Sequence, residues 1–146
     1  PNSVIQGGQA KTLYEAAGFA TVTLTASDVT TISTVVTAAC DQADVIYIPT
    51  DNNLAANVAT VHAQNKANRC LPIVCGEESM NNLCGVATYS IDYYELGKQT
   101  AKMAFDILMG NKKVGEMPVE YQSGTPALSK NETVANDIGF DLSVLD

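Results

Sequence analysis

The sequence predicts an α/β fold with a mainly parallel sheet and helices on both of its faces. Segments typical of strands alternate with segments typical of helices along almost the whole chain, which predicts right-handed βαβ units. Two strand segments are short continuous apolar runs, as in strands that are covered on both faces. Apolar residues make up 46% of the 146 positions and charged residues 16%, which supplies a core and excludes a disordered chain.

The first part of the chain predicts a helix, a strand and a second helix. A polar residue at position 2 or 3 is placed to cap the first helix, and Gly18 is placed to end it. Residues 19–24 are rich in β-branched side chains, which is typical of a strand. The second helix begins at Ser27 or Asp28, and its apolar residues then recur at helical spacing.

The middle of the chain predicts two buried strands separated by a helix. Residues 44–49 and 71–75 are the continuous apolar runs, and a polar turn follows each of them. Apolar residues at helical spacing over 54–61 predict the helix between them. The second run stops at Gly76.

The last part predicts a further strand, a long helix and three short elements. The strand covers 85–90, and the helix runs from about 92 to 109, where Gly110 ends it. The short elements are strands at 117–121 and 126–129 and a helix at 131–137.

Composition excludes several classes of partner. The net charge is −8 and the eight basic residues are scattered, which argues against nucleic acid, because phosphate binding requires clustered Lys and Arg. No apolar run approaches the roughly 20 residues that span a bilayer. The chain begins without Met or a basic leader, so we expect a mature or truncated piece of a longer protein.

The residues that carry most enzyme and metal chemistry are sparse. The only histidine, His62, falls in the middle of a predicted helix, and no phosphate loop, dinucleotide turn or nucleophile elbow is present. We therefore expect no cofactor, no metal site and no catalysis. The spacing of the four cysteines does not fit a zinc site, and it favours free thiols over disulfides while leaving all three pairings open: Cys40, Cys70, Cys75 and Cys84.

Candidate binding residues follow from the predicted sheet, because ligands of open parallel sheets bind beyond the carboxyl ends of the strands. These ends offer acceptors for an ammonium group and helix N-termini for a carboxylate, which together suit an amino-acid-like zwitterion. Simple helix capping explains each residue equally well, except at Glu77 and Glu78, where no strong helical pattern follows. The candidates are Ser27, Thr50, Asp51, Asn52, Glu77, Glu78, Asp92 and Tyr93.

Several of these segments, in this order, resemble a known family. The motifs are IYIPTDN at 46–52 and ATYSIDYYELG at 87–97, supported by 72–78 and 117–121. They resemble the tryptophan-binding-protein type of ABC transporter substrate-binding protein, and the likeness covers nearly the whole chain. Cys75 and Cys84 depart from the family pattern.

The resemblance implies a periplasmic-binding-protein type I fold, in which two Rossmann-like lobes close on a ligand. Residues 1–146 resemble the C-terminal lobe alone, with hinge crossings near 88–92 and 115–125 and no N-terminal lobe in the sequence. The helix at 92–109 packs on the first lobe in such proteins. We therefore expect its apolar face to fold back on its own lobe or to be buried in a dimer.

The resemblance also implies roles for individual residues. Thr50, Asp51 and Asn52 would be the central ligand contacts, and Glu77 would accept a hydrogen bond or pair with an ammonium group. Ser3, Ser27 and Asp92 are secondary candidates. An aromatic ligand would stack on Tyr89 or Tyr93.

The expected function is the extracytoplasmic solute-binding component of an ABC importer, anchored as a lipoprotein. The expected ligand is a small molecule, an amino acid of the aromatic type, and the expected partner is a membrane permease. A ligand-sensing domain of a transcriptional regulator shares the fold and is the main alternative. An α/β enzyme is the third, since fold alone does not decide function. A signal peptide with a lipobox cysteine upstream would favour the importer, and a basic helix-turn-helix the regulator.

Overall fold

The structure, a computed structural model, describes residues 2–122 and 126–145. The chain forms two compact units, which we call the sheet unit and the α6 unit. The sheet unit is discontinuous and comprises Pro1–Tyr89 and Leu128–Asp146, and the α6 unit comprises Ser90–Ala127. The first boundary lies within the hinge crossing predicted at 88–92, but a hinge role there stays a prediction.

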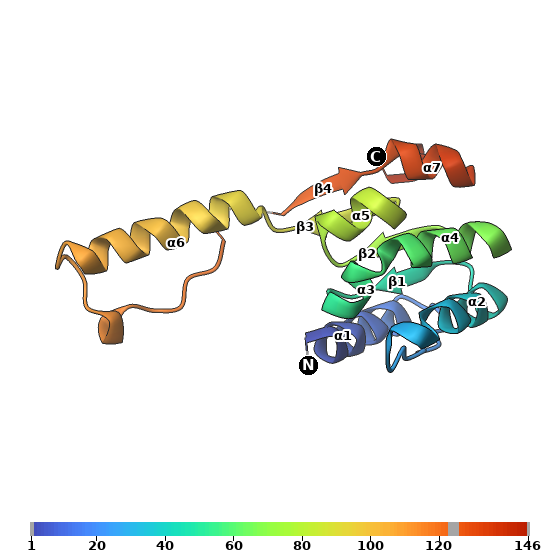
Figure 1. The fold of residues 1–146 in the computed structure, drawn as a ribbon, viewed down its shortest axis with the longest axis horizontal. Coiled ribbons are helices and arrows are strands. Elements are labelled where there is room, and N and C mark those ends of the chain that lie inside the picture. Colours follow the sequence, from blue (N-terminus) through green and yellow to red (C-terminus); the bar gives the residue numbers. More distant parts are fainter. Residues whose placement is uncertain (1, 123–125, 146) are drawn as a thin grey trace. The chain divides into compact units, whose positions relative to one another are not determined.

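Four strands form one sheet in the order β1-β2-β3-β4 (Figure 1). They are β1 (Ile46–Ile48), β2 (Ile73–Cys75), β3 (Ala87–Ser90) and β4 (Ala127–Lys130). β1 pairs in parallel with β2, and β2 in parallel with β3. The prediction of a mainly parallel sheet is confirmed.

The helices alternate with these strands as the sequence predicts. Those of the sheet unit are α1 (Asn2–Ala16), η1 (Val29–Thr31), α2 (Ile32–Gln42), α3 (Asn52–Ala56), α4 (Val58–Asn68), α5 (Glu78–Cys84), α7 (Glu132–Ile138) and η3 (Leu142–Leu145). The α6 unit holds α6 (Tyr93–Leu108) and η2 (Val114–Glu116). Gly18 and Gly110 follow α1 and α6 with φ of 90° and 72°, a region where glycine is favoured, so both predicted helix ends are confirmed.

Helices contact both faces of the sheet. On one face, Ile48, Ile73 and Cys75 belong to a buried cluster with side chains from α2, α4 and α5. On the other face, Tyr47 points away from its two neighbours in β1, because side chains alternate along a strand. Its ring lies edge-on to Tyr14 of α1, with the ring centroids 6.2 Å apart. The α/β architecture with helices on both faces is therefore confirmed.

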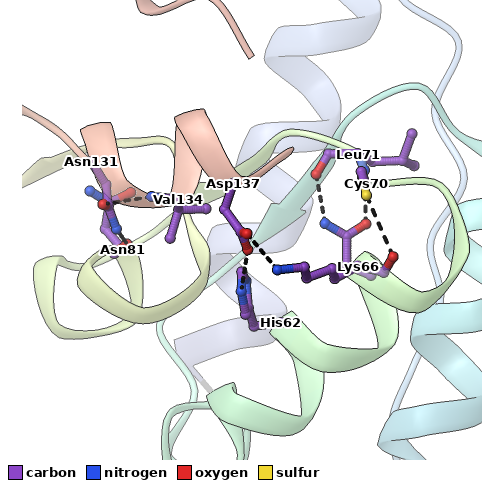
Figure 2. Close-up of polar contacts among 9 residues, drawn as sticks. His62, Lys66, Cys70, Leu71, Asn81, Asn131, Val134 and Asp137 are labelled. Carbon is purple, nitrogen blue, oxygen red and sulfur yellow. Dashed lines mark hydrogen bonds and ion pairs between the residues drawn. The ribbon is translucent and has the colours of Figure 1, made fainter. Parts of the chain in front are cut away.

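A buried asparagine fixes the turn before β2. Asn65 of α4 is 1% exposed, and its side chain donates to the Leu71 carbonyl (2.7 Å) and accepts from the Leu71 N–H (2.9 Å). These two bonds hold the turn before β2, where Cys70 adopts a φ of 55°. Figure 2 shows Cys70 and Leu71 in this turn. A buried side chain amide thus supplies the hydrogen bonds that the turn's own backbone lacks.

The last helix docks through polar contacts as well as through an apolar face. Asn131 caps α7 by accepting from the Val134 N–H (3.1 Å), and it donates to the Asn81 carbonyl of α5 (2.7 Å). At the other end of α7, the Asp137 carboxylate forms an ion pair with Lys66 of α4 and lies 3.4 Å from the His62 Nε2 of the same helix (Figure 2). α7 is therefore tied to two helices that precede it by many residues. The helix predicted at 131–137 is confirmed as α7.

Three predicted elements differ from the structure. Residues 19–24 form no strand, and Phe19 and Val22 are 62% and 49% exposed. Residues 117–121 also form no strand. The β-branched residues of 19–24 favour a strand only where they pack on a sheet, which this segment does not do. The helix predicted at 54–61 is two helices, α3 and α4, which meet at Asn57.

The α6 unit is held together by its own polar contacts. Asp92 caps α6 by accepting from the N–H groups of Tyr94 (2.9 Å) and Glu95 (3.0 Å). Its own N–H donates to the side chain of Gln122 (2.7 Å), so the returning segment lies beside the start of the helix. No residue of α6 is buried.

The Asp137 contacts predict a pH-dependent stability. A hydrogen bond from Lys66 holds the pKa of Asp137 below its ordinary value, with His62 adding to the effect. Because the folded pKa lies below the unfolded value of about 3.9, the contribution is present above that pH and is lost as the pH falls through the folded pKa. We expect Asp137→Asn to lower the free energy of unfolding in urea near neutral pH and to have a smaller effect at about pH 3.

A double-mutant cycle supplies the control. Lys66→Met should cost less in the Asp137→Asn background than in the wild type, because the partner is already neutral. An equal gap between wild type and Asp137→Asn at both pH values would show that the carboxylate charge does not contribute.

Candidate functional site

Two polar turns lie side by side at one edge of the sheet. β1 and β2 are adjacent and parallel, with Ile48 opposite Cys75, so their carboxyl ends share this edge. Residues 49–52 follow β1 and residues 76–78 follow β2. We call these two turns the strand-end edge. The topology thus brings together the two turns in which the sequence placed most of its candidates.

The two turns touch through Thr50 and Gly76. The Thr50 hydroxyl donates to the Gly76 carbonyl (3.2 Å), and the Gly76 N–H donates to the Ile48 carbonyl (2.8 Å). A Cβ atom at position 76 would lie 2.8 Å from the Thr50 backbone nitrogen, a distance that real Cβ atoms essentially never show. Only glycine therefore permits this close approach.

Asp51 caps α3 and faces α1. Its Oδ1 accepts from the N–H groups of Asn53 (2.9 Å) and Leu54 (3.2 Å). A side-chain hydrogen bond from Ser3, followed by the Leu54 N–H, holds the pKa of Asp51 below its ordinary value. The carboxylate is therefore stabilised in its charged form, and a ligand contact at Ser3 stays a prediction.

Gln6 is a neighbour of the strand-end edge that the sequence analysis missed. Its side-chain oxygen accepts from the Thr50 N–H at 2.7 Å. Ser3 and Gln6 are three residues apart in α1 and therefore lie on one side of the helix. The polar pair at this spacing was the one sequence feature that could have indicated Gln6. No pattern in the sequence predicts that this side of α1 contacts the turn after β1.

Glu77 is a helix cap, which corrects the expectation that no helix follows it. The side chain is 9% exposed, and its carboxylate accepts from the Ser79 hydroxyl (2.5 Å), the Ser79 N–H (3.2 Å) and the Met80 N–H (2.9 Å). α5 begins at Glu78 and has only seven residues, too few to show a clear apolar period. Both Glu77 oxygens serve the fold, so a ligand contact at Glu77 stays a prediction.

The remaining candidates have different surroundings. Glu78 is exposed and accepts from the Ser129 hydroxyl (3.4 Å), and Asn52 is exposed at the start of α3. Ser27 donates to Asp28 (3.4 Å), which caps η1. Asp92 and Tyr93 belong to the α6 unit, where Asp92 is the helix cap and Tyr93 is 57% exposed. Ligand contact by any of these residues stays a prediction.

The strand-end edge offers carboxylates, a hydroxyl and amides, which bind polar ligands by hydrogen bonds and ion pairs.

His62 lies in α4 beside a surface depression that Leu83 and Asp137 also line, and its Nε2 is 3.4 Å from the Asp137 carboxylate. Within residues 2–122 and 126–145, no group of three or more His, Cys, Asp or Glu side chains could hold a metal ion. Over the same residues, no helix is both long enough and apolar enough to cross a membrane.

The family model described as ABC transporter substrate binding protein matches residues 1–143. The chain belongs to this family. The family named from the sequence motifs is thereby confirmed, and substrate-binding proteins of this kind are not enzymes. A tyrosine-binding protein of Clostridioides difficile (strain R20291) is 32% identical over 91 residues, which is 62% of this chain and 26% of that protein.

Two solved structures extend the similarity of this substrate-binding chain to its fold. An ABC domain from Streptococcus pneumonia in complex with L-Trp is 30% identical with a TM-score of 0.84, and the match covers 99% of this chain and 48% of that one. A conserved domain protein from Vibrio cholerae is 27% identical with a TM-score of 0.83 and the same two coverages. The chain thus spans about half the length of the solved structures it matches.

The close approach at Gly76 gives a testable prediction for this substrate-binding chain. Gly76→Ala should lower the free energy of unfolding by about 1–3 kcal/mol, because the added methyl group forces the two turns apart. Urea unfolding followed by circular dichroism measures the change.

Gly8→Ala is the matched control, because a Cβ there meets nothing within 4 Å and the residue lies inside α1. It should be neutral or stabilise by up to about 1 kcal/mol. Equal effects of the two substitutions would contradict the importance of the Thr50–Gly76 contact.

Proposed function

We propose that this chain is one lobe of the extracytoplasmic solute-binding component of an ABC importer, and that the whole protein captures an aromatic amino acid between two lobes. The observation that carries the proposal is the strand-end edge, where a charged Asp51 and the Thr50–Gly76 contact lie at the carboxyl ends of parallel strands. The family match supports the class of protein. The ligands named for two relatives, tyrosine and L-Trp, support the class of ligand.

Asp51 is the proposed partner of the ligand's ammonium group. A carboxylate accepts about four hydrogen bonds, and the contacts with Ser3, Asn53 and Leu54 leave room for another. The side chain is also partly exposed, so a ligand can reach it. The amide of Asn52, which is exposed next to it, is a suitable donor to the ligand's carboxylate.

Glu77 has a supporting part in this proposal. Its buried carboxylate holds the start of α5 and thereby the turn that touches Thr50. We propose that it shapes the strand-end edge and adds negative potential there, which favours a cationic group.

Tyr89 is the proposed stacking partner for an aromatic side chain. It lies near the carboxyl end of β3 and is 68% exposed. Val74 pairs with Ala87 across the sheet, so Tyr89 projects from the same face as Val74. Aromatic rings that stack offset or edge-on gain about 0.5–1.5 kcal/mol beyond their buried area. Tyr93 is the alternative partner.

Capture in the whole protein would proceed by hinge closure without any change in covalent bonds. A ligand that contacts both lobes stabilises the closed state, and one lobe alone should bind it weakly. The proposed crossings are those predicted near 88–92 and 115–125, of which 123–125 lie outside the described residues. The membrane permease would recognise the closed form, and a lipid anchor would hold the protein outside the cytoplasm.

The apolar surface of α6 is consistent with a missing partner. Phe105 and Leu108 are 58% and 84% exposed, although apolar side chains of this size favour burial. We propose that the N-terminal lobe covers this surface in the whole protein. A second copy of the chain would cover it in the isolated lobe.

Titration calorimetry of the complete two-lobed protein with a panel of amino acids and sugars tests the proposal. Tyrosine or tryptophan should bind tightly, and Asp51→Asn should weaken binding by about 10- to 100-fold, the value of one hydrogen bond to a charged group. Asparagine is as good an N-cap as aspartate, so this change removes the charge while it keeps the start of α3.

Asp141→Asn is the matched control, because Asp141 is also a capping carboxylate whose pKa is lowered, by the Ser143 backbone N–H, but it lies near the C-terminus. Its binding should equal that of the wild type. Absence of binding across the panel, or equal affinity of Asp51→Asn and wild type, would refute the proposed ligand or the proposed site respectively.

A further inference from the structure

Two buried cysteines face each other beside the strand-end edge. Cys75 is the last residue of β2 and Cys84 the last residue of α5. Their sulfur atoms are 3.8 Å apart, and the residues are 2% and 1% exposed. The other two thiols have different partners, since Cys40 donates to the Asn65 side chain (3.5 Å) and Cys70 to the Lys66 carbonyl (3.5 Å). Cys75 and Cys84 are thus a pair that the fold itself selects.

Gly85 leaves room for the sulfur atom of Cys75. Gly85 follows Cys84, and a Cβ there would lie 2.7 Å from the Cys75 sulfur and 2.4 Å from the Asn81 Oδ1. A larger residue at position 85 would therefore push the Cys75 side chain aside. The Gly85 N–H also donates to the Asn81 carbonyl (3.1 Å), which fixes the end of α5 on which Cys84 sits.

We propose that Cys75 and Cys84 form a structural disulfide when the protein folds outside the cytoplasm, and that this bond fastens the end of β2 to the end of α5. The inference rests on the extracytoplasmic location in the proposed function, because disulfides persist in oxidising compartments. The bond would hold the last residue of α5, and Glu77 already caps its first turn, so both ends of the helix would be fixed. It would thereby brace the turn that touches Thr50.

The reaction requires an oxidant, for which a small-molecule disulfide of the glutathione type suffices. One cysteine thiolate attacks a sulfur of the oxidant, forms a mixed disulfide and releases one thiol. The second cysteine thiolate then attacks the protein sulfur of the mixed disulfide and releases the second thiol. The two cysteines lose two protons and two electrons in total, and the oxidant gains both.

The bond forms during folding, as α5 brings the two thiols together and before it buries them. The hydrogen bond with Cys84, together with burial, raises the pKa of the Cys75 thiol. Since the thiolate is the reactive species, the folded reduced pair reacts slowly, whereas the unfolded chain reacts at the ordinary rate. Oxidative refolding is therefore the condition under which the pair becomes a disulfide.

Peptide mapping after oxidative refolding tests the proposal on the complete two-lobed protein. The protein is unfolded in reductant, refolded with oxidised and reduced glutathione, alkylated and digested. Trypsin alone leaves Cys75 and Cys84 in one peptide, because no Lys or Arg lies between them, but a Glu-specific protease cuts after Glu77 or Glu78. The two proteases are therefore used together, and in this double digest a Cys70→Ala background removes the other cysteine that shares the fragment 70–77 with Cys75.

We expect a linked pair of fragments that contain Cys75 and Cys84, two hydrogen atoms lighter than the separate peptides, and an alkylated Cys40. Reduction should then lower the midpoint of urea unfolding in the wild type and in Cys40→Ala, but not in Cys84→Ala. Alkylation of both Cys75 and Cys84 after oxidative refolding, or their linkage to other cysteines, would overturn the proposal.

Ligand titration of the reduced and oxidised forms separates this inference from the proposed function. A linked pair in a protein that binds none of the panel would leave the disulfide standing and remove the proposed ligand. Ligand binding by a protein whose Cys75 and Cys84 are both alkylated after oxidative refolding would support the proposed ligand and remove the disulfide.

Discussion

The first N–H groups of a helix have no carbonyl partner within the helix, and this constraint organises the chain. Each of the four strands described is followed by a helix whose cap is a carboxylate or an amide: Asp51, Glu77, Asp92 and Asn131. Because β1, β2 and β3 run in parallel, the cap after β1 and the cap after β2 lie at the same edge. Helix capping therefore concentrates negative charge where a ligand of such a sheet would bind.

Fold and function consequently use the same side chains at this edge. The Asp51 carboxylate holds the start of α3, is bonded by Ser3, and is the group best placed to meet an ammonium ion. Glu77 is committed more fully, since both of its oxygens accept hydrogen bonds within α5. The difference between them is solvent access, because Asp51 is partly exposed and Glu77 is buried. Removal of either side chain would change the helix as well as any bound ligand, and only isosteric changes separate the two effects.

The parts of the fold that the sequence predicted are those with a strong local pattern. The apolar runs at 44–49 and 71–75 predicted β1 and β2, and the polar turns after them predicted the edge. The strand predicted at 19–24 is wrong, because a β-branched run forms a strand only where a neighbouring strand can pair with it. The Gln6 contact with Thr50 and the meeting of Cys75 with Cys84 depend on tertiary packing. No periodicity or spacing in a single sequence carries that information.

The discontinuity of the sheet unit has a consequence for the order in which the protein is made. Val86 and Ala87 of the β3 region are buried against Val134 and Ala135 of α7, and the Asn131 N–H donates to the Val86 carbonyl (2.9 Å). If folding proceeds from the N-terminal end, these partners meet only after the whole α6 unit, which separates them in the sequence, has become available. Until then β3 is an open edge with unpaired backbone groups, the kind of surface on which strands of other chains assemble. The exposed edge of β3 is therefore a point at which a partly folded chain can aggregate, and it closes only when residues after the α6 unit pack on it.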